Sequence, residues 1–140
     1  MVRINLIRPG LLSDQHLIAE YAEILMLMEY IRRYPSDDDI PERFCLGKGH
    51  MKFFKNKAAY LRKRHERIRK EMRRRGFRTG RAVSFKGMNR RLINDWKPSA
   101  KDMVVIKKRI AERIRSKRGF YRYYGEVRSC TFFLNMLKKT

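Results

Sequence analysis

The chain has 140 residues, of which 36 are Lys or Arg and 14 are Asp or Glu, so its formal net charge is +22 at pH 7. A chain of this length buries an adequate core without disulfides or metals, and we expect one domain over residues 1–140, with residues 125–140 as a candidate extension. Its positive charge exceeds what solubility requires and predicts a polyanionic partner, with nucleic acid first and an anionic membrane surface second.

The most apolar stretch, residues 17–31, is interrupted by Glu20, Glu23 and Glu29. A membrane-spanning helix needs about 20 largely uninterrupted apolar residues, and a secretory signal also needs a continuous apolar segment. We therefore expect an intracellular monomer without membrane contact, located in the cytoplasm, the nucleoid or wherever its DNA partner lies.

The cysteines Cys45 and Cys130 and the histidines His16, His50 and His65 lack the spacing of a metal site. Isolated cysteines in a reducing compartment are typical of small buried side chains. A single histidine more often forms hydrogen bonds than binds a metal. The sequence therefore predicts neither a metal nor a cofactor.

A first helix is predicted to begin after Ser13, a good N-cap residue, with Asp14 favourable in its first turn. Apolar residues continue at helical spacing to Tyr34, and Pro35 ends the pattern. The predicted apolar positions are Leu17, Tyr21, Ile24 or Leu25, Met28 and Ile31.

Three polar residues of this helix, His16, Glu20 and Glu23, lie at i, i+4 and i+7. This spacing predicts one stripe beside the apolar face. For Glu20, an ion pair with one of the surplus arginines is an equally good interpretation.

A second helix is predicted over residues 52–75 after a loop rich in Pro, Gly and Asp, with Gly76 as the residue that ends it. Its apolar stripe is narrow and the rest of its circumference is basic. The predicted stripe consists of Phe54, Ala58, Leu61, Ile68 and Met72.

Residues 77–98 form an irregular basic connection, and Ser99 is expected to cap a third helix that ends near Gly119. Its predicted core positions are Met103, Ile106, Ile110 and Ile114. The segment after residue 125 can either pack on the helices or fray. The sequence thus predicts an all-α, compact single domain of three main helices, with irregular connections and an aromatic, basic C-terminal tail.

The positive charge is concentrated in runs that could neutralise many phosphates, which predicts strongly salt-dependent DNA binding. Residues 120–124 interleave aromatic rings with a cation, as in segments that stack on an exposed base while they hold a phosphate. Filling of the core is the alternative role for such aromatic residues. The candidate cations are residues 62–64 and 73–75, Arg109, Arg113, Arg115, Lys117, Arg118 and Arg122.

A glutamate near a DNA-binding surface is repelled by phosphates, so Glu23 calls for a chemical reason. An α-amino group has a pKa near 8, against about 10.4 for lysine, so on the order of a tenth of it is uncharged at neutral pH. Such an amine can attack C1′ of a sugar, displace a base and leave a Schiff base. A nearby carboxylate can stabilise the oxocarbenium-like charge and move the protons.

Several separated blocks of the chain resemble the pyrimidine-dimer DNA glycosylase/AP lyase family, the phage UV-damage endonuclease V type. They occur in the family's order across nearly the whole chain, which is more specific than any single motif. The blocks are RINL at 3–6, the segment DQHLIAEYAE at 14–23, LGKGH at 46–50, FF at 53–54, LRKR at 61–64, RGF at 75–77 and YYG at 123–125.

The resemblance implies catalytic roles for Val2, whose α-amine would be the nucleophile after removal of Met1, and for Glu23 as the catalytic carboxylate. It implies that double-stranded DNA with damaged bases is the partner, and that a base is flipped out of a kinked duplex. The residues implied or expected to contact DNA or line the site are Arg3, Gln15, His16, Arg109, Arg113, Phe120, Tyr121 and Arg122.

The chain departs from the best-known member of that family at positions beside the expected site. Ala22 and Met26 stand where that member has arginines, and Phe120 replaces a tryptophan. Loss of two arginines beside Glu23 leaves the lesion preference open. The expected activity is excision of UV-induced pyrimidine dimers with associated β-elimination; the alternatives are an AP lyase or glycosylase for another damaged base, and a non-catalytic basic DNA-binding protein.

Overall fold

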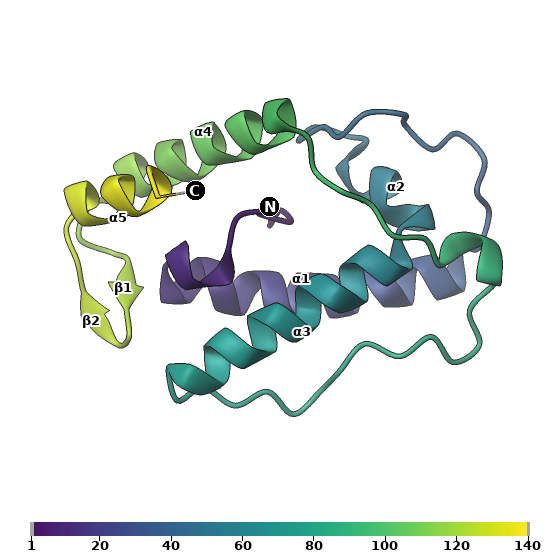
Figure 1. The fold of residues 1–140 in the computed structure, drawn as a ribbon, viewed down its shortest axis with the longest axis horizontal. Helices are drawn as coiled ribbons and strands as arrows, with labels where there is room; N and C mark the ends of the chain where they lie inside the picture. Colours follow the sequence, from purple (N-terminus) through teal and green to yellow (C-terminus); the bar gives the residue numbers. More distant parts are fainter. Residues whose placement is uncertain (1, 140) are drawn as a thin grey trace.

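The computed structural model describes residues 2–139, and most of them are helical (Figure 1). The prediction of a mainly helical chain is confirmed, but the number of helices is wrong. The described residues contain five α-helices and a two-stranded sheet: α1 (Asp14–Arg33), α2 (His50–Phe53), α3 (Ala58–Arg74), α4 (Ala100–Ser116), α5 (Cys130–Leu137), β1 (Arg122–Tyr123) and β2 (Glu126–Val127), with 3-10 turns η1 (Pro9–Leu11), η2 (Phe54–Asn56) and η3 (Arg90–Leu92).

Helix α1 begins and ends where its sequence predicts. The Ser13 hydroxyl accepts a hydrogen bond from the backbone N–H of His16 at 3.1 Å, which confirms the N-cap. The helix ends at Arg33, two residues before Pro35. Its buried apolar residues are Leu17, Ile24, Leu27, Met28 and Ile31.

The prediction of one continuous helix over residues 52–75 is wrong, because Lys57 leaves the helical region with φ −127° and ψ 37°. The Lys57 ammonium donates to the carbonyl of Phe53 at 2.7 Å. The turn before the break carries Phe53 and Phe54, whose ring centroids lie 5.0 and 5.7 Å from that of Trp96. The interruption therefore serves a buried aromatic cluster.

The ends of α3 and α4 follow their capping sequences. After α3, Gly76 has φ 84°, and the N–H of Phe77 bonds the Met72 carbonyl at 2.9 Å, as in a Schellman motif. At the start of α4, Ser99 and Asp102 form a capping box.

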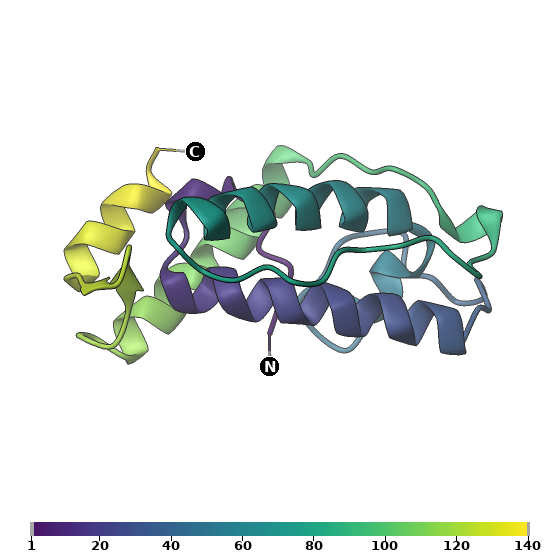
Figure 2. The same ribbon diagram turned by 90° about the horizontal axis from the view of Figure 1, so that it is seen from below.

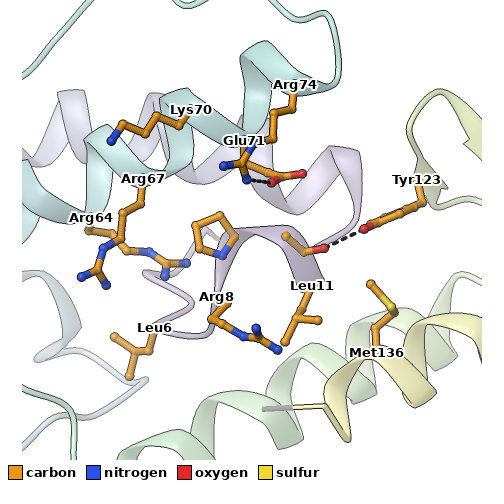
Figure 3. A pocket seen from close by; sticks show the side chains of 12 residues that line it. Leu6, Arg8, Leu11, Arg64, Arg67, Lys70, Glu71, Arg74, Tyr123 and Met136 are labelled. Carbon is orange, nitrogen blue, oxygen red and sulfur yellow. Dashed lines mark hydrogen bonds and ion pairs between the residues drawn. The ribbon is translucent and has the colours of Figure 1, made fainter.

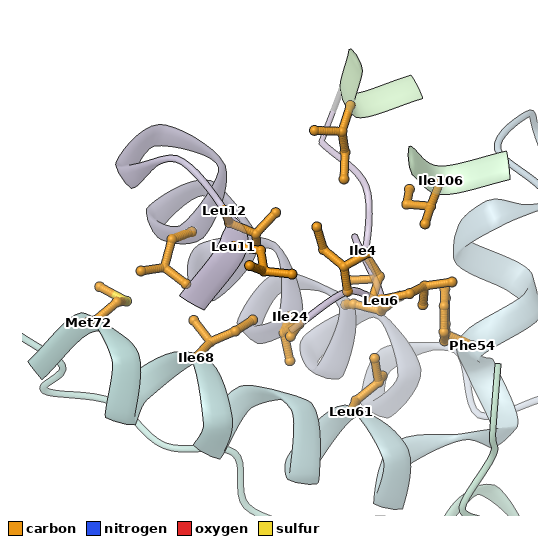
Figure 4. Close-up of a cluster of buried hydrophobic side chains, with 14 of the residues drawn as sticks. Ile4, Leu6, Leu11, Leu12, Ile24, Phe54, Leu61, Ile68, Met72 and Ile106 are labelled. Atoms are coloured by element: carbon orange, nitrogen blue, oxygen red, sulfur yellow. The ribbon is translucent and has the colours of Figure 1, made fainter. Parts of the chain in front are cut away.

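Helices α1 and α3 pack against each other, and α4 runs on the other side of the N-terminal segment (Figure 1). Figure 4 shows Ile4 and Leu6 between Ile24 of α1 and Ile106 of α4. The first residues of the chain are therefore part of the hydrophobic core. Burial of this segment fixes the position of Val2, which directly precedes it.

The C-terminal tail packs instead of fraying. Tyr124 and Gly125 form a two-residue hairpin loop in which both φ values are positive, 54° and 81°. Their backbone N–H groups donate to the Asp14 carboxylate at 3.1 and 2.8 Å, which attaches the hairpin to the start of α1. Helix α5 then packs on α4 and buries Phe133, Met136 and Leu137.

Candidate active site at the N-terminal segment

The N-terminal segment is held first by His50, from the LGKGH block. Its Nε2 accepts a hydrogen bond from the backbone N–H of Ile4 at 3.0 Å, and its Nδ1 lies 2.8 Å from the Cys45 carbonyl. Because a carbonyl only accepts, Nδ1 carries the proton and the ring is neutral. Burial lowers the pKa of His50 to about 4, so this arrangement persists at neutral pH.

A buried ion pair holds the next residues. Glu20 is completely buried and accepts the backbone and side-chain N–H groups of Asn5, both at 3.0 Å. Its carboxylate also accepts two hydrogen bonds from Arg64, at 2.7 and 3.0 Å. The ion-pair interpretation of Glu20 is therefore correct, and this glutamate anchors the N-terminal segment to α1 and α3.

The segment turns sharply just beyond this anchor. Leu6 has φ 63°, rare for a residue with a side chain, and the N–H of Ile7 bonds the Asn5 carbonyl at 2.6 Å. Arg64 donates to the Ile7 carbonyl as well. The Glu20–Arg64 pair thus binds both sides of the turn and stabilises a conformation that Leu6 would otherwise avoid.

A cavity of about 270 Å³ opens where the segment begins, between α1, α4 and the chain that enters the hairpin. Every predicted site residue lines it except Glu23 and Arg122. The lining residues are Val2, Arg3, Asn5, Gln15, His16, Ala19, Arg109, Arg113, Lys117, Phe120 and Tyr121.

The cavity is strongly positive. Burial lowers the pKa of Arg109 to about 10, and the neighbouring Arg113 and Arg3 lower it further in the same sense. Arg109 still carries its charge at pH 7. Three guanidinium groups and Lys117 around so small a cavity create a field that attracts phosphates.

His16 is neutral despite its place among cations. Burial first, and then Arg109 and Arg113, lower the pKa of His16 to about 4. Its ring stacks on Tyr121 with centroids 4.9 Å apart, and its Nδ1 lies 2.9 Å from the Ser13 hydroxyl oxygen. The imidazole therefore forms part of an aromatic wall and adds no charge to the cavity.

Gln15 connects α1 to the aromatic tail. Its amide N–H donates to the Phe120 carbonyl and its amide oxygen accepts the N–H of Arg122, both at 2.9 Å. These bonds hold Phe120 and Tyr121 at the cavity. The Arg122 side chain instead donates to the Gly125 carbonyl at 3.1 Å, within its own hairpin.

Glu23 lies about two helical turns beyond His16 on α1 and does not line the cavity. Its side chain is half-buried, and burial raises the pKa of its carboxyl group, while Arg3 acts in the opposite direction. Within residues 2–139 no hydrogen bond or ion pair engages its carboxylate. Such a carboxyl group can take up and release a proton more readily near neutral pH than an ordinary glutamate.

The model of the pyrimidine dimer DNA glycosylase family matches residues 1–85. The chain belongs to this family. The match includes the N-terminal segment and α1 to α3, and with them Val2, Arg3 and Glu23. DNA is therefore the substrate of this pyrimidine dimer DNA glycosylase family member. Residues 86–140, which supply Arg109 and Arg113 to the cavity, lie beyond the match.

The sequence analysis missed the residues that hold the site together. His50 and Arg64 fall in two of the blocks that carry the family resemblance, LGKGH and LRKR, yet no role was predicted for either. Asn5 and Lys117 also line the cavity without having been predicted as site residues. A histidine or arginine inside a block that is otherwise apolar or glycine-rich was the available signal.

No grouping of three or more His, Cys, Asp or Glu side chains suited to a metal ion occurs within residues 2–139. In the same residues no helix has both the length and the apolar character to cross a membrane.

Proposed function

We propose that this glycosylase removes pyrimidine dimers from double-stranded DNA and then cleaves the strand by β-elimination, with the α-amine of Val2 as nucleophile. The observation that supports it most is the position of Val2 and Arg3 in a cavity lined by Arg109 and Arg113. A nucleophile with a backbone nitrogen needs a fixed chain start. The bonds to Ile4 and Asn5 supply that rigidity two and three residues away.

In the first step the uncharged amine forms a bond to C1′ while the bond from C1′ to the base nitrogen breaks. The electron pair leaves with the base, which takes up a proton. The attacking nitrogen then loses one proton to the Glu23 carboxylate, and this proton passes to O4′ as the sugar ring opens. The product is a protonated Schiff base between Val2 and C1′.

In the second step Glu23 removes a proton from C2′, and the electron pair that remains expels the 3′ phosphate of the strand. Water then hydrolyses the conjugated Schiff base and frees the amine. A carboxyl group that both accepts and donates protons in one cycle works best with a raised pKa, the direction found for Glu23.

The cations around the cavity would hold the phosphates that flank the lesion. Arg3, Arg109 and Arg113 would bind the strand that is cut, and the exposed ring of Phe120 would stack on an unpaired base. His16, being neutral, would contribute its ring face and would leave the cationic contacts to the arginines.

Borohydride trapping tests the proposal directly, because reduction converts the Schiff base into a stable protein–DNA adduct. The protein freed of Met1 is incubated with one duplex that carries a cis-syn thymine dimer and another that carries an abasic site. We expect adducts on both, and none with protein acetylated at its N-terminal amine. Absence of an adduct on both duplexes would leave the alternative of a non-catalytic DNA-binding protein.

A second candidate substrate is supported by the surface beside Glu23. Met26 is 64% exposed, and with Ala22 it borders a largely apolar cavity of about 610 Å³. Arginines at these two positions would bind the phosphates of a distorted duplex. An adduct on the abasic duplex alone would assign this chain to AP lyase chemistry or to another damaged base.

A further inference from the structure

The outward side of α3 carries a second cavity, of about 570 Å³, that no step of the proposed reaction uses (Figure 3). Apolar side chains form part of its lining, and cations from α3 and from Arg8 surround them. The lining residues are Leu6, Arg8, Pro9, Gly10, Leu11, Arg64, Arg67, Lys70, Glu71, Arg74, Tyr123 and Met136.

The acidic residue of this cavity does not offset its positive charge. Glu71 is buried, and its carboxylate accepts hydrogen bonds from Arg74 at 3.1 Å and from Arg75 at 2.9 Å. Arg67 and Lys70 are exposed and form no hydrogen bond or ion pair within residues 2–139. Two unpaired cations thus face a cavity in which the carboxylate is already engaged.

The positive charge continues along the helix beyond this cavity. Lys63, Arg67, Lys70 and Arg74 follow one another at i, i+4, i+7 and i+11, which is one stripe about 16 Å long. Arg67 also lines two adjoining cavities of about 450 and 350 Å³. With about 3.4 Å of axis per phosphate of one strand, the stripe matches roughly five consecutive phosphates.

The α3 stripe, meaning Lys63, Arg67, Lys70 and Arg74, lies away from the catalytic cavity. Figure 2 shows α3 on one side of the molecule, and α1 with the N-terminus beyond it on the other. The two cavities share no lining residue. A duplex seated at Val2 would therefore leave the α3 stripe exposed.

We propose that the α3 stripe is a second DNA-binding surface, which holds the phosphate backbone of another duplex segment while the first occupies the catalytic cavity. A row of cations fits a chain of phosphates better than a single anion, because a single anion would engage only one or two of them. The inference goes beyond the proposed reaction and needs only that the chain binds DNA.

Two binding surfaces on opposite sides let the protein bridge two DNA segments. The protein can then pass from one segment to the other without becoming free in solution. Its dissociation from one duplex should accelerate as the concentration of a competing duplex rises. A protein with one surface dissociates at a rate that does not depend on the competitor.

A bridging assay tests the second surface. The full chain is loaded on immobilised, undamaged 20-bp duplexes at about 0.1 M salt, and capture of a second, fluorescent duplex is measured. We expect the unmodified protein to capture it and the variant Arg67→Glu/Lys70→Glu to capture at least tenfold less. The matched control Arg90→Glu/Arg91→Glu makes the same change in net charge at exposed residues of η3 that line none of the three α3 cavities.

The same preparations supply readouts that separate this inference from the proposed function. Binding of the first duplex and borohydride trapping should change by less than about threefold in Arg67→Glu/Lys70→Glu. If trapping fails in the unmodified protein but bridging persists, only the proposed reaction is wrong. Equal loss of bridging in both double variants would overturn the second surface, as would full bridging by Arg67→Glu/Lys70→Glu.

Two controls guard against other causes. The milder Arg67→Gln/Lys70→Gln variant keeps the test valid if charge reversal unfolds α3, and it should reduce capture by a factor of about three or more. Sedimentation of the DNA-free protein checks whether bridging comes from protein dimers. Bridging that occurs only in a dimeric fraction would overturn the proposal.

Discussion

Two glutamates on the same helix, three residues apart, lie in opposite chemical environments. Glu20 is fully buried, and Asn5 and Arg64 donate four hydrogen bonds to its carboxylate. Glu23 is half-buried, its carboxylate has no hydrogen-bond donor within residues 2–139, and burial raises the pKa of its carboxyl group. The helix therefore presents one carboxylate that is fixed in its ionised form and one that is available for proton transfer.

The contrast follows from the direction in which each side chain leaves α1. Glu20 points toward α3, where Arg64 supplies a guanidinium group in bidentate geometry. Glu23 lies within electrostatic range of Arg3, which lowers its pKa less than burial raises it. A carboxylate that structure depends on cannot change its protonation state cheaply, so catalysis uses the other one.

The largest effect should come from Glu23→Gln, which removes the proton acceptor but keeps the shape of the side chain. We expect strand cleavage to fall by about 10²–10⁴-fold, the range for loss of a general acid or base. Because the raised pKa means that the folded state disfavours the ionised carboxylate, the free energy of unfolding should be unchanged within about 0.5 kcal/mol or increase. Single-turnover cleavage of an abasic duplex and urea unfolding measure the two quantities. Normal cleavage by this variant would assign the proton transfers to another group.

Glu20→Gln should produce the opposite pattern. It leaves the Arg64 guanidinium buried without a counter-charge, which we expect to lower the free energy of unfolding by about 3–5 kcal/mol. The double variant Glu20→Gln/Arg64→Met removes both charges and should recover a large part of this loss. Urea unfolding at pH 7 checks both. If the single and double variants are equally destabilised, the loss does not come from the uncompensated charge.

The position of these residues on α1 could be predicted from the sequence, but their partners could not. Ser13, Pro35 and the apolar spacing define the helix, since capping and periodicity are local properties. Arg64 is 44 residues from Glu20 along the chain and one of many arginines, so nothing local selects it. The same holds for His50, which reaches Ile4 only through tertiary folding.

The tail and the second helix mark the limits of local patterns. The Phe53–Phe54 pair packs with Trp96, a contact distant in sequence, and that packing outweighs the helical pattern across Lys57. Helix α5 is short, and its stability depends on α4, against which it packs. The cavity residues were predicted largely through the family resemblance, because periodicity alone does not bring α4 beside Val2.

Acidification should weaken the anchoring of the N-terminal segment. The pKa values of His16 and His50 are lowered to about 4 in the folded protein, against about 6.5 when exposed, so the unfolded chain binds more protons between these values. Stability contributed by the neutral rings is complete above pH 6.5 and is lost as the pH falls toward 4. For the buried His50 we expect a loss of about 2–3 kcal/mol.

Urea unfolding at several pH values between 7 and 4 measures this dependence. In His50→Gln the titrating ring is absent, so the slope over this interval should decrease by up to one proton. An unchanged slope would show that His50 does not hold its neutral form. Trapping by His50→Gln at pH 7 should also be slower, because the bond to Ile4 steadies the chain two residues from Val2.

The smallest expected effect concerns Gln15, whose two hydrogen bonds hold the Phe120–Arg122 segment at the cavity. Gln15→Ala removes both, at a cost of about 1–2 kcal/mol for a pair of neutral hydrogen bonds. The effect should be local, because Tyr121 remains packed on His16 and Phe133. Hydrogen exchange of the Arg122 amide should accelerate, since that N–H donates to the Gln15 amide oxygen. Gln15→Glu keeps an acceptor for this N–H but cannot donate to Phe120, so protection of Arg122 should survive in it. If both variants lost protection equally, the clamp would depend on packing of the side chain and not on its hydrogen bonds.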